Sequence, residues 1–382
     1  MERDVDTLIV GGGVVGCALA YYLARAGVDI ALIERDELNS YASGANAGSL
    51  HLQLTAPYFA QTRPDELKAT VSSLIPLSLE AAQVWLELSQ DLEGDIEFRI
   101  GGGLMVAESK KELDLLGEKA KIERKAGLAA EILSRSDLRN AAPYLSDRFV
   151  GAEFCPGEGK VNPLVATLAL ASAARKAGGR LRCQTELLGL ERKTGGFLAI
   201  TNDGEIRCRR FINAAGSFAR RVAAMVGARL PVEARAQHMN VTEPARTLIP
   251  HLVQHAGRRL TLKQATNGSI IVGGGLPARI DSRSSSVSVV KESLEINLKT
   301  ALVAVPALGG LRLIRAWAGQ ALITDGNPIL GEYPGIDGFF NAVPASSGYT
   351  TGPICARILT ELLLGQRSAG DLRAFSIERF RD

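Results

Sequence analysis

The sequence contains few of the residues that build metal centres and disulfide frameworks. Five cysteines and four histidines occur among 382 residues, and no two cysteines stand in a CxxC spacing. The chain is therefore not expected to hold an iron–sulfur cluster in a usual spacing by itself. His251 and His255 are four residues apart, but no HExxH motif surrounds them, so we expect no metal site. We also expect no disulfides, and we assign Cys17 and Cys355, in apolar helical stretches, to the core.

Long apolar runs and an excess of charge are missing as well. Nowhere do 18 uninterrupted apolar residues occur, which argues against a transmembrane helix. The short charged stretch 1–6 does not resemble a signal peptide. The 44 basic and 41 acidic residues leave a net charge of +3, too small to indicate nucleic-acid binding. A cytoplasmic protein is the default expectation.

The stretch from Val5 to Arg35 carries the clearest motif. A short apolar run leads into Gly11, Gly13 and Gly16 of a GxGxxG motif, and a helix and a second apolar strand follow. The first glycine permits a tight turn, the second lets a pyrophosphate approach the backbone, and the third lets helix and strand pack closely. Glu34 follows Gly16 by 18 residues, near the roughly 20 expected for a carboxylate that binds a ribose 2′-hydroxyl. This predicts a dinucleotide site, without deciding between FAD and NAD.

Helical and extended patterns alternate along the rest of the chain. The periodicity predicts an α/β protein in which a nucleotide domain is interrupted by a second, mixed domain. Helices are predicted over 64–92, 109–128, 135–142, 162–177, 289–303 and 353–364. Strands are predicted over 96–106, 180–191, 197–201, 205–210, 211–216, 236–241, 259–264, 269–272, 312–317 and 338–343.

By these patterns the chain resembles the amine-oxidising flavoproteins of the D-amino-acid oxidase type, which include glycine oxidase and sarcosine oxidase. The resemblance extends from Asp6 to about Arg373. It is most specific in RAWAG at 315–319, TD at 324–325, PILG at 328–331 and GFFNA at 338–342, which follow the family's carboxy-terminal flavin segment. It implies FAD as the cofactor, with NAD a distant second.

The fold that this resemblance implies is a Rossmann-type FAD-binding domain interleaved with a substrate domain of a mixed, antiparallel sheet plus helices. The expected division gives residues 1–85, 150–225 and 308–382 to the FAD-binding domain. Residues 86–149 and 226–307 then form the substrate domain.

Three further segments are expected to contact the flavin nucleotide. Ser43 to Gly48 resembles the flavin-contacting loop of D-amino-acid dehydrogenases, and Leu187 stands where the family's chain contacts adenine through its backbone. Ser346 to Thr351 leads into a helix begun by Pro353, whose positive end would favour the negative charge of a reduced flavin. The expected FAD-binding residues are Gly11, Gly13, Val14, Val15, Gly16, Glu34, Arg35, Ser43, Asn46, Ala47, Gly48, Leu50, Leu187, Ala215, Gly216, Gly319, Ser347, Gly348, Tyr349 and Thr350.

The chain departs from the family pattern at three positions. Glycine oxidase and D-amino-acid dehydrogenase carry an arginine just after Trp-x-Gly that clamps the substrate carboxylate, whereas Gln320-Ala321-Leu322 follows Gly319 here. Thr350 stands where we align the lysine with which sarcosine oxidases promote reaction with oxygen. Asn162 stands near the histidine that tethers FMN in heterotetrameric sarcosine oxidase. We therefore expect no ordinary carboxylate clamp, poor oxidase activity and no covalent FMN.

Within the family, the chain is most similar to the B (β) subunits of bacterial opine oxidases, relatives of D-hydroxyproline and D-proline dehydrogenase β subunits. This resemblance implies an A (α) subunit and a small ferredoxin-like iron–sulfur subunit as partners. It also implies an FMN at the interface with a partner subunit. Peripheral attachment to the inner membrane would come only through such a complex.

The reaction that the resemblance implies is oxidation of a secondary amine amino acid, an opine such as nopaline or octopine. A hydride passes to flavin N5, the imine is hydrolysed to an amino acid and a keto acid, and electrons go to partner subunits rather than to O2. Two alternatives stay open: a D-amino-acid, D-proline or glycine-type amine dehydrogenase or oxidase, and a flavin-carrying electron-transfer subunit without amine oxidation of its own. The substrate-side candidates are Tyr349, Lys263, Gln264, His51 and Trp317. Lys263 and Gln264 alternate on a predicted strand, so at most one of them can point into the site.

Overall fold

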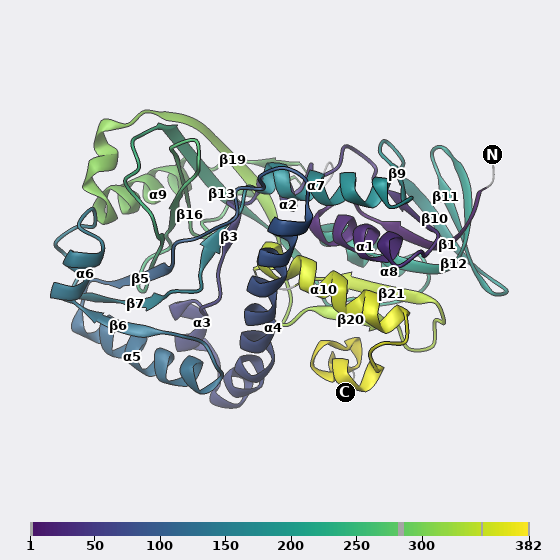
Figure 1. Cartoon of the computed structure of the whole chain (residues 1–382), viewed down its shortest axis with the longest axis horizontal. Coiled ribbons are helices and arrows are strands. Elements are labelled where there is room, and N and C mark those ends of the chain that lie inside the picture. The colour runs from purple at the N-terminus through teal and green to yellow at the C-terminus, as the bar shows by residue number, and fades with distance from the viewer. Residues whose placement is uncertain (1–2, 282–285, 345–346, 381–382) are drawn as a thin grey trace.

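The computed structural model describes residues 3–281, 286–344 and 347–380. Ser346, at the start of the predicted C-terminal flavin segment, lies outside these ranges. The described chain forms two large sheets with a long helix, α4, between them, and Figure 1 shows the first sheet to the right and the second to the left. No helix of the described ranges combines the length and the apolar character needed to cross a membrane.

The elements have the following bounds. The helices are α1 Val14–Arg25, α2 Ala42–Ala45, α3 Ala56–Gln61, α4 Pro64–Asp91, α5 Lys110–Lys125, α6 Arg135–Ala141, α7 Pro163–Lys176, α8 Ala219–Ala224, α9 Lys291–Ala304 and α10 Gly348–Leu363, with 3-10 turns η1 Gly216–Phe218, η2 Pro306–Gly310, η3 Ala369–Phe375 and η4 Ile377–Phe380. The strands of the first half are β1 Arg3–Val10, β2 Ile30–Ile33, β3 Ser49–Leu50, β4 Arg99–Ile100, β5 Gly103–Ala107, β6 Glu131–Ser134, β7 Gly151–Cys155, β8 Gly159–Lys160, β9 Arg180–Arg182 and β10 Leu187–Lys193. The later strands are β11 Gly196–Thr201, β12 Gly204–Asn213, β13 Glu233–Pro244, β14 Leu252–His255, β15 Thr261–Gln264, β16 Ser269–Gly273, β17 Arg279–Ile280, β18 Val287–Ser288, β19 Leu313–Ile323, β20 Ile329–Glu332 and β21 Phe339–Val343.

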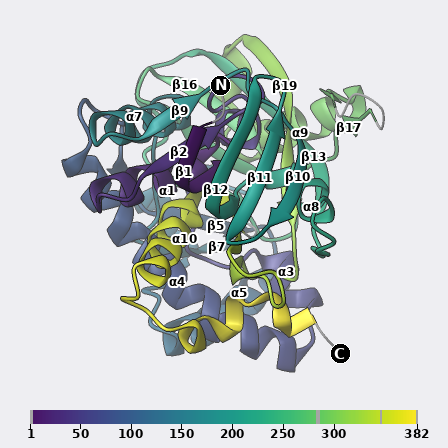
Figure 2. The same cartoon turned by 90° about the vertical axis from the view of Figure 1, so that its right-hand side faces the viewer.

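The first sheet contains the predicted nucleotide unit. Its strands follow the order β10-β11-β12-β1-β2-β9, and β21 pairs with the far end of β12 and with β20. Strand β1 is parallel to both β2 and β12, and side chains from both faces of this centre are fully buried. Ile9 and Leu32 belong to the core that contains residues of α1, α7 and α10, whereas Leu8 and Ile33 belong to the core that contains residues of α8 and the β10–β11 hairpin. Figure 2 shows α1 and α10 on one side of the sheet and α8 on the other. Both faces of the parallel strands are therefore covered, as apolar runs of this kind require.

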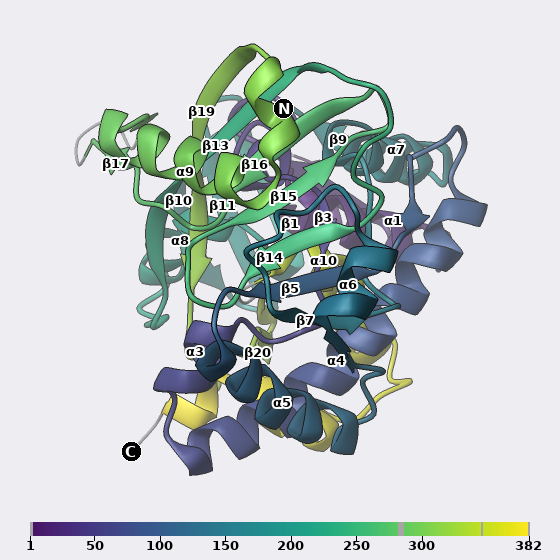
Figure 3. The ribbon, with the colours of Figure 1, turned by 90° about the vertical axis from the view of Figure 1, so that its left-hand side faces the viewer.

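The second sheet is mostly antiparallel, in the order β19-β13-β16-β15-β14-β5-β7-β6. Helices α5, α6 and α9 lie over it in the view of Figure 3. The two sheets together give the α/β fold that we predict, with a parallel centre in one sheet and a mixed, largely antiparallel arrangement in the other.

Three details differ from the sequence-based expectation. The predicted strand 180–191 is two strands, β9 and β10, at opposite edges of the first sheet, because Gln184 adopts a positive φ of 53° and breaks the extended run. The last helix begins at Gly348 instead of Pro353, which places Pro353 inside α10 at the cost of one backbone hydrogen bond. Strands β7 and β19 pair within the second sheet, although the predicted division gives both to the FAD-binding domain. The domain boundaries themselves stay a prediction.

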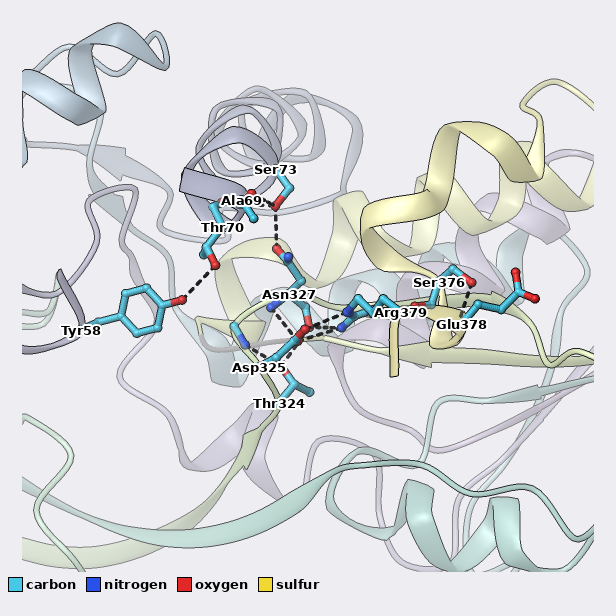
Figure 4. A network of polar contacts seen from close by, with 11 residues as sticks. Tyr58, Ala69, Thr70, Ser73, Thr324, Asp325, Asn327, Ser376, Glu378 and Arg379 are labelled. Carbon is cyan, nitrogen blue, oxygen red and sulfur yellow. Dashed lines mark hydrogen bonds and ion pairs between the residues drawn. The ribbon is translucent and has the colours of Figure 1, made fainter. Parts of the chain in front are cut away.

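A polar network fixes the C-terminal end to the connection between β19 and β20 (Figure 4). The guanidinium of Arg379 donates to both carboxylate oxygens of Asp325 at 2.8 Å and to the carbonyl of Asn327 at 3.1 Å. The side chain of Asn327 accepts a hydrogen bond of 2.9 Å from Ser73 Oγ on α4. The end of the chain, the β19–β20 turn and the long helix are thus joined.

Candidate cofactor and substrate site

A cavity of about 450 Å³ lies where the two sheets meet. From the first sheet it is lined by the residues at the carboxyl ends of β1, β2 and β12, and from the second by residues of β13, β15 and β19. Ligands of parallel α/β sheets bind at this edge of the strands. The predicted site residues that line the cavity are Gly11, Gly13, Val14, Val15, Glu34, Arg35, Ser43, Asn46, Ala47, His51, Leu187, Ala215, Gly216, Gly319, Ser347, Gly348, Tyr349 and Thr350.

Gly11 and Gly16 are required by the local geometry, and Gly13 is closely packed as well. Gly11 has a φ of +118°, and a Cβ there would lie 2.4 Å from the carbonyl oxygen of Ala214. A Cβ on Gly13 would lie 2.9 Å from Ser43 Oγ, and one on Gly16 would lie 1.9 Å from the carbonyl oxygen of Gly11. The turn therefore brings bare backbone and the N-terminus of α1 to the cavity, an arrangement that suits a pyrophosphate.

Glu34 is held at the end of β2, where the motif expects the ribose-binding acid. Its carboxylate accepts hydrogen bonds from the backbone N–H of Gly12 at 2.7 Å and of Asp36 at 3.0 Å. Beside it, the Arg35 guanidinium stacks 3.8 Å from the ring centroid of Phe218 and 4.6 Å from that of Tyr41. Tyr41 and Phe218 also line the cavity but were not predicted, because single aromatic residues in loops carry no periodic signal.

The small-residue loop 42–50 is held in place by side chains of its own and of β19. Asn46 Oδ1 accepts a hydrogen bond of 2.6 Å from the N–H of Gly48, and Trp317 Nε1 donates to the carbonyl of Ala45 at 2.8 Å. A Cβ on Gly319 would lie 2.7 Å from the Cβ of Ala45, so β19 and the loop touch closely. Trp317 does not line the cavity, and its observed contact is with this loop.

Two further predicted cofactor residues, Gly48 and Leu50, lie behind the cavity wall. Gly48 has a φ of +70°, and a Cβ there would lie 2.1 Å from the carbonyl oxygen of Val161. Leu50 is buried in the core beneath α1. Like Gly16, both residues shape the backbone around the cavity without lining it.

The N-terminus of α10 opens onto the cavity through Ser347 and Gly348. Ser347 adopts the left-handed conformation, with φ 61° and ψ 32°, and so turns the chain sharply into the helix. Tyr349 stacks on Trp85 with ring centroids 5.5 Å apart, and Trp85 Nε1 donates to the carbonyl of Thr350 at 2.9 Å. The long helix α4 therefore supports the start of α10 at the point where its free N–H groups are available to a ligand.

The hydroxyl of Tyr349 is directed toward Thr167 of α7. It lies 3.0 Å from Thr167 Oγ1 on α7, and burial raises the pKa of the phenol above its ordinary value. The phenol is therefore neutral at physiological pH and is already hydrogen-bonded within the protein.

Lys263 and Gln264 on β15 do not line the cavity. Lys263 is buried, its Nζ donates to the carbonyl of Val161 at 3.3 Å, and burial lowers the pKa of its amine to about 7. The Gln264 amide accepts hydrogen bonds from the N–H groups of Leu248 and Ile249 and donates to nearby backbone carbonyls. Its polar atoms are engaged in holding the backbone.

Among the described residues, those that the second sheet contributes to the lining include no Asp, Glu, Lys or Arg. They include Gln237, Met239, Thr261, Gln320 and Leu322. The charged residues among the described lining, Glu34, Arg35, Glu186 and Arg221, come from the first sheet and its connections. The alternation of β13 and β19 gave no sign of which residues would face the cavity, because these strands pair with each other over ten residues only in the folded chain.

Comparisons with known proteins agree with this geometry. The family described as FAD dependent oxidoreductase (DAO) matches residues 6–362. The chain is 32% identical to the B subunit of opine oxidase from Rhizobium meliloti, covering 99% of this chain and 98% of that one, and 25% identical to the beta subunit of sarcosine oxidase from Rhizobium meliloti (strain 1021), covering 98% and 88%. The crystal structure of glycine oxidase from Geobacillus kaustophilus superposes with a TM-score of 0.88 at 26% identity over 100% of both chains. The cavity at the edge of the first sheet, with the glycine turn and Glu34 in its lining, agrees with an FAD cofactor. The family match over residues 6–362 shows that the chain belongs to the FAD-dependent oxidoreductases of the DAO family and that its cofactor is FAD.

Proposed function

We propose that this chain is the amine-oxidising subunit of a heteromeric dehydrogenase and that its substrate is an opine, a secondary amine formed from an amino acid and a keto acid. The observation that carries the proposal is the cavity wall formed by the second sheet, whose described lining residues include no Asp, Glu, Lys or Arg, with Gln320-Ala321-Leu322 where relatives of the simple amino-acid type carry an arginine. The similarity to the B subunit of opine oxidase over the whole chain supports the same substrate class.

The residues present suit FAD along the whole length of the cavity. Gly11 to Val15 would offer backbone N–H groups to the pyrophosphate, Glu34 would offer a carboxylate to the ribose, and Leu187 would contact the adenine. The loop around Asn46 and the start of α10 at Gly348 would hold the flavin ring. Bound FAD supplies the two-electron acceptor for oxidation of the carbon beside the amine nitrogen.

The surrounding chain favours the reactive form of the substrate. A mostly apolar lining disfavours an ammonium cation relative to the neutral amine, and the neutral amine is the form that can release a hydride. Met239 contributes apolar surface, while Gln237 offers a neutral hydrogen-bonding group. No acid–base relay is required for this chemistry.

Electron transfer to a partner subunit is the second part of the proposal. Two relatives over nearly the whole chain, from opine oxidase and from sarcosine oxidase, are named as subunits. Lys263 lies beside the small-residue loop 42–50, since its Nζ is 3.1 Å from where a Cβ on Gly48 would be. Because the pKa of its amine is lowered to about 7, the amine is only partly protonated at neutral pH. Electrostatic support for superoxide formation is therefore weak, which favours a partner as acceptor.

The substrate is tested by anaerobic reduction of the bound FAD. Octopine and nopaline should bleach the flavin at least ten times faster than D-alanine, D-proline or sarcosine at equal concentration. Reoxidation by an artificial dye should be much faster than reoxidation by air. Faster reduction by D-alanine or D-proline would show that the substrate is a simple amino acid and not an opine. If none of these amines reduces the flavin, the chain would be an electron-transfer subunit without amine oxidation of its own.

The partner chains are tested by purification after co-expression with the genes that adjoin this one. FAD accompanied by an equal amount of FMN, together with an A (α) subunit and an iron–sulfur subunit, would support the complex. Asn162 accepts a hydrogen bond from Leu164 N at 3.0 Å and donates to Glu97 at 3.0 Å, so its side chain is engaged within the chain. Any FMN found should therefore be released by denaturation.

A further inference from the structure

Among the described residues that line the cavity, His51 can present a strong hydrogen-bond donor, and its side chain is part of a buried network. His51 follows β3 and lines the cavity, with 19% of its side chain exposed. Its Nδ1 is 3.0 Å from Gln254 Nε2 on β14 and 3.7 Å from Glu158 Oε2 in the turn between β7 and β8. Both neighbours lie at the same ring nitrogen, so Nε2 is the nitrogen left for the cavity.

The Glu158 carboxylate has no exposed surface and is only partly satisfied. Its Oε1 accepts hydrogen bonds from the backbone N–H of Leu52 at 2.8 Å and of Gln53 at 3.0 Å. Its Oε2 is buried without a hydrogen-bond partner among the described residues, and a Cβ on Gly103 would lie 1.7 Å from it. The backbone at residue 103 thus leaves room for this oxygen beside His51.

Glu158 is ionised in this setting. Burial alone would raise the pKa of the carboxyl, but the His51 ring and the N–H groups of Gln53 and Leu52 outweigh it, and the net pKa lies below its usual value. A buried carboxylate is costly unless a donor or a cation pairs with it. With the Gln254 amide donating to Nδ1, the ring carries its proton on Nε2.

From this geometry we infer that His51 binds a substrate carboxylate through Nε2–H, and that Glu158 and Gln254 are positioning residues that fix the ring. The inference rests on the proposed function and deepens it, because it names the group that takes the role of the missing arginine next to Gly319. A charge-assisted hydrogen bond of this kind contributes about 1.5–3 kcal/mol, or roughly 10- to 100-fold in affinity.

The test measures binding without turnover. The probe is 2-aminoisobutyrate, which has no hydrogen on the carbon that would be oxidised, and its carboxamide is the matched uncharged ligand. The dissociation constants of both are measured by calorimetry on FAD-loaded protein. We expect His51→Ala to weaken the carboxylate about 10- to 100-fold and the carboxamide less than 3-fold. His51→Gln, which keeps an N–H donor, should recover part of the loss.

Two variants separate positioning from folding. Glu158→Gln should raise the dissociation constant of 2-aminoisobutyrate severalfold while the limiting rate of flavin reduction by octopine stays within 2-fold. His251→Ala removes a histidine that contacts Tyr144 outside the cavity lining. It should leave the dissociation constants of both ligands unchanged. Equal weakening of the carboxylate and the carboxamide in His51→Ala, or no weakening, would overturn the inference, as would failure of the unmodified protein to bind 2-aminoisobutyrate. If the ligand contrast holds but no amine reduces the flavin, the carboxylate site stands and the proposed oxidation falls.

Discussion

Gly16 is where the smallest change should have the largest local effect. A Cβ there would lie 1.9 Å from the carbonyl oxygen of Gly11, so α1 would have to move away from β1. We expect Gly16→Ala to lower the free energy of unfolding by about 1–3 kcal/mol, the usual cost of overpacking, and to weaken retention of FAD. Denaturant unfolding and the flavin content after gel filtration measure the two effects.

Gly117 provides the matched control, because it lies inside α5 with no heavy atom within 4 Å of its would-be Cβ. Gly117→Ala should stabilise the protein by about 0.5–1 kcal/mol through helix propensity and leave the retention of FAD unchanged. Equal behaviour of the two alanine variants would show that the close packing at Gly16 has no energetic consequence.

Lys263 makes a pH-dependent contribution to stability. Burial lowers the pKa of its amine to about 7, against about 10.4 in an unfolded chain. Between these pH values the unfolded state binds a proton that the folded state lacks, so the stability of the protein rises with pH through this window. The destabilisation is fully present below pH 7. Lys263→Met should therefore exceed the unmodified protein in stability by about 4 kcal/mol at pH 6, and the difference should shrink as the pH approaches 10.

The measurement is the free energy of unfolding of both proteins at several pH values from 6 to 10. Lys299→Met removes a lysine whose side chain is 77% exposed and should show no such trend. A constant difference between Lys263→Met and the unmodified protein would mean that the amine titrates normally in the folded state.

Side-chain direction is what the sequence conveys least at single positions. The glycine motif could be predicted because turn, helix start and strand end are all local and need specific backbone at fixed spacing. Trp317 and Gln264 could be assigned to the right segments, but nothing local indicates that one donates to Ala45 and that the other is engaged with Leu248 and Ile249. Such contacts depend on segments far away in the chain.

The contact between β19 and the small-residue loop 42–50 should contribute to the affinity for FAD. Trp317→Phe keeps most of the ring surface and removes the hydrogen bond to the Ala45 carbonyl. Losing about 1 kcal/mol of loop stabilisation should raise the dissociation constant of FAD roughly 5-fold. Quenching of flavin fluorescence on binding to the apoprotein measures it.

Arg315→Ala is the control for this strand, since the Arg315 guanidinium lies 5.7 Å from the Trp317 ring centroid and no hydrogen bond joins it to the loop in the described contacts. Its affinity for FAD should be unchanged. An unchanged affinity in Trp317→Phe as well would show that the loop is held by its own contacts, such as Asn46 to Gly48.

The ends of helices and strands could be predicted only where a local sequence signal marks them. Asn162 before Pro163 correctly marks the start of α7, with Asn162 as the capping side chain. The break at Gln184 and the start of α10 at Ser347 both rely on a positive φ in a residue other than glycine. Tertiary contacts hold those conformations, so the sequence offered no warning of them.

The arrangement of the whole chain follows from pairings between distant segments. The resemblance to amine-oxidising flavoproteins predicted the two interleaved halves, and the family match and the superposed glycine oxidase structure confirm the fold. Periodicity alone could not assign β19, which leaves the second sheet at Ile323 and leads to β20 of the first. The substrate end of the cavity depends on that crossing, which is why Gln237, Met239 and Thr261 could not be predicted as its lining.

The central claim, that this fold holds FAD for oxidation chemistry, is tested most directly by the flavin content of the purified protein. Denaturing the folded protein and separating the released flavins should give about one FAD per chain, free of covalent attachment. Folded protein that has not been stripped and yet contains no flavin, and that does not take up added FAD, would contradict the assignment of the cavity and everything derived from it.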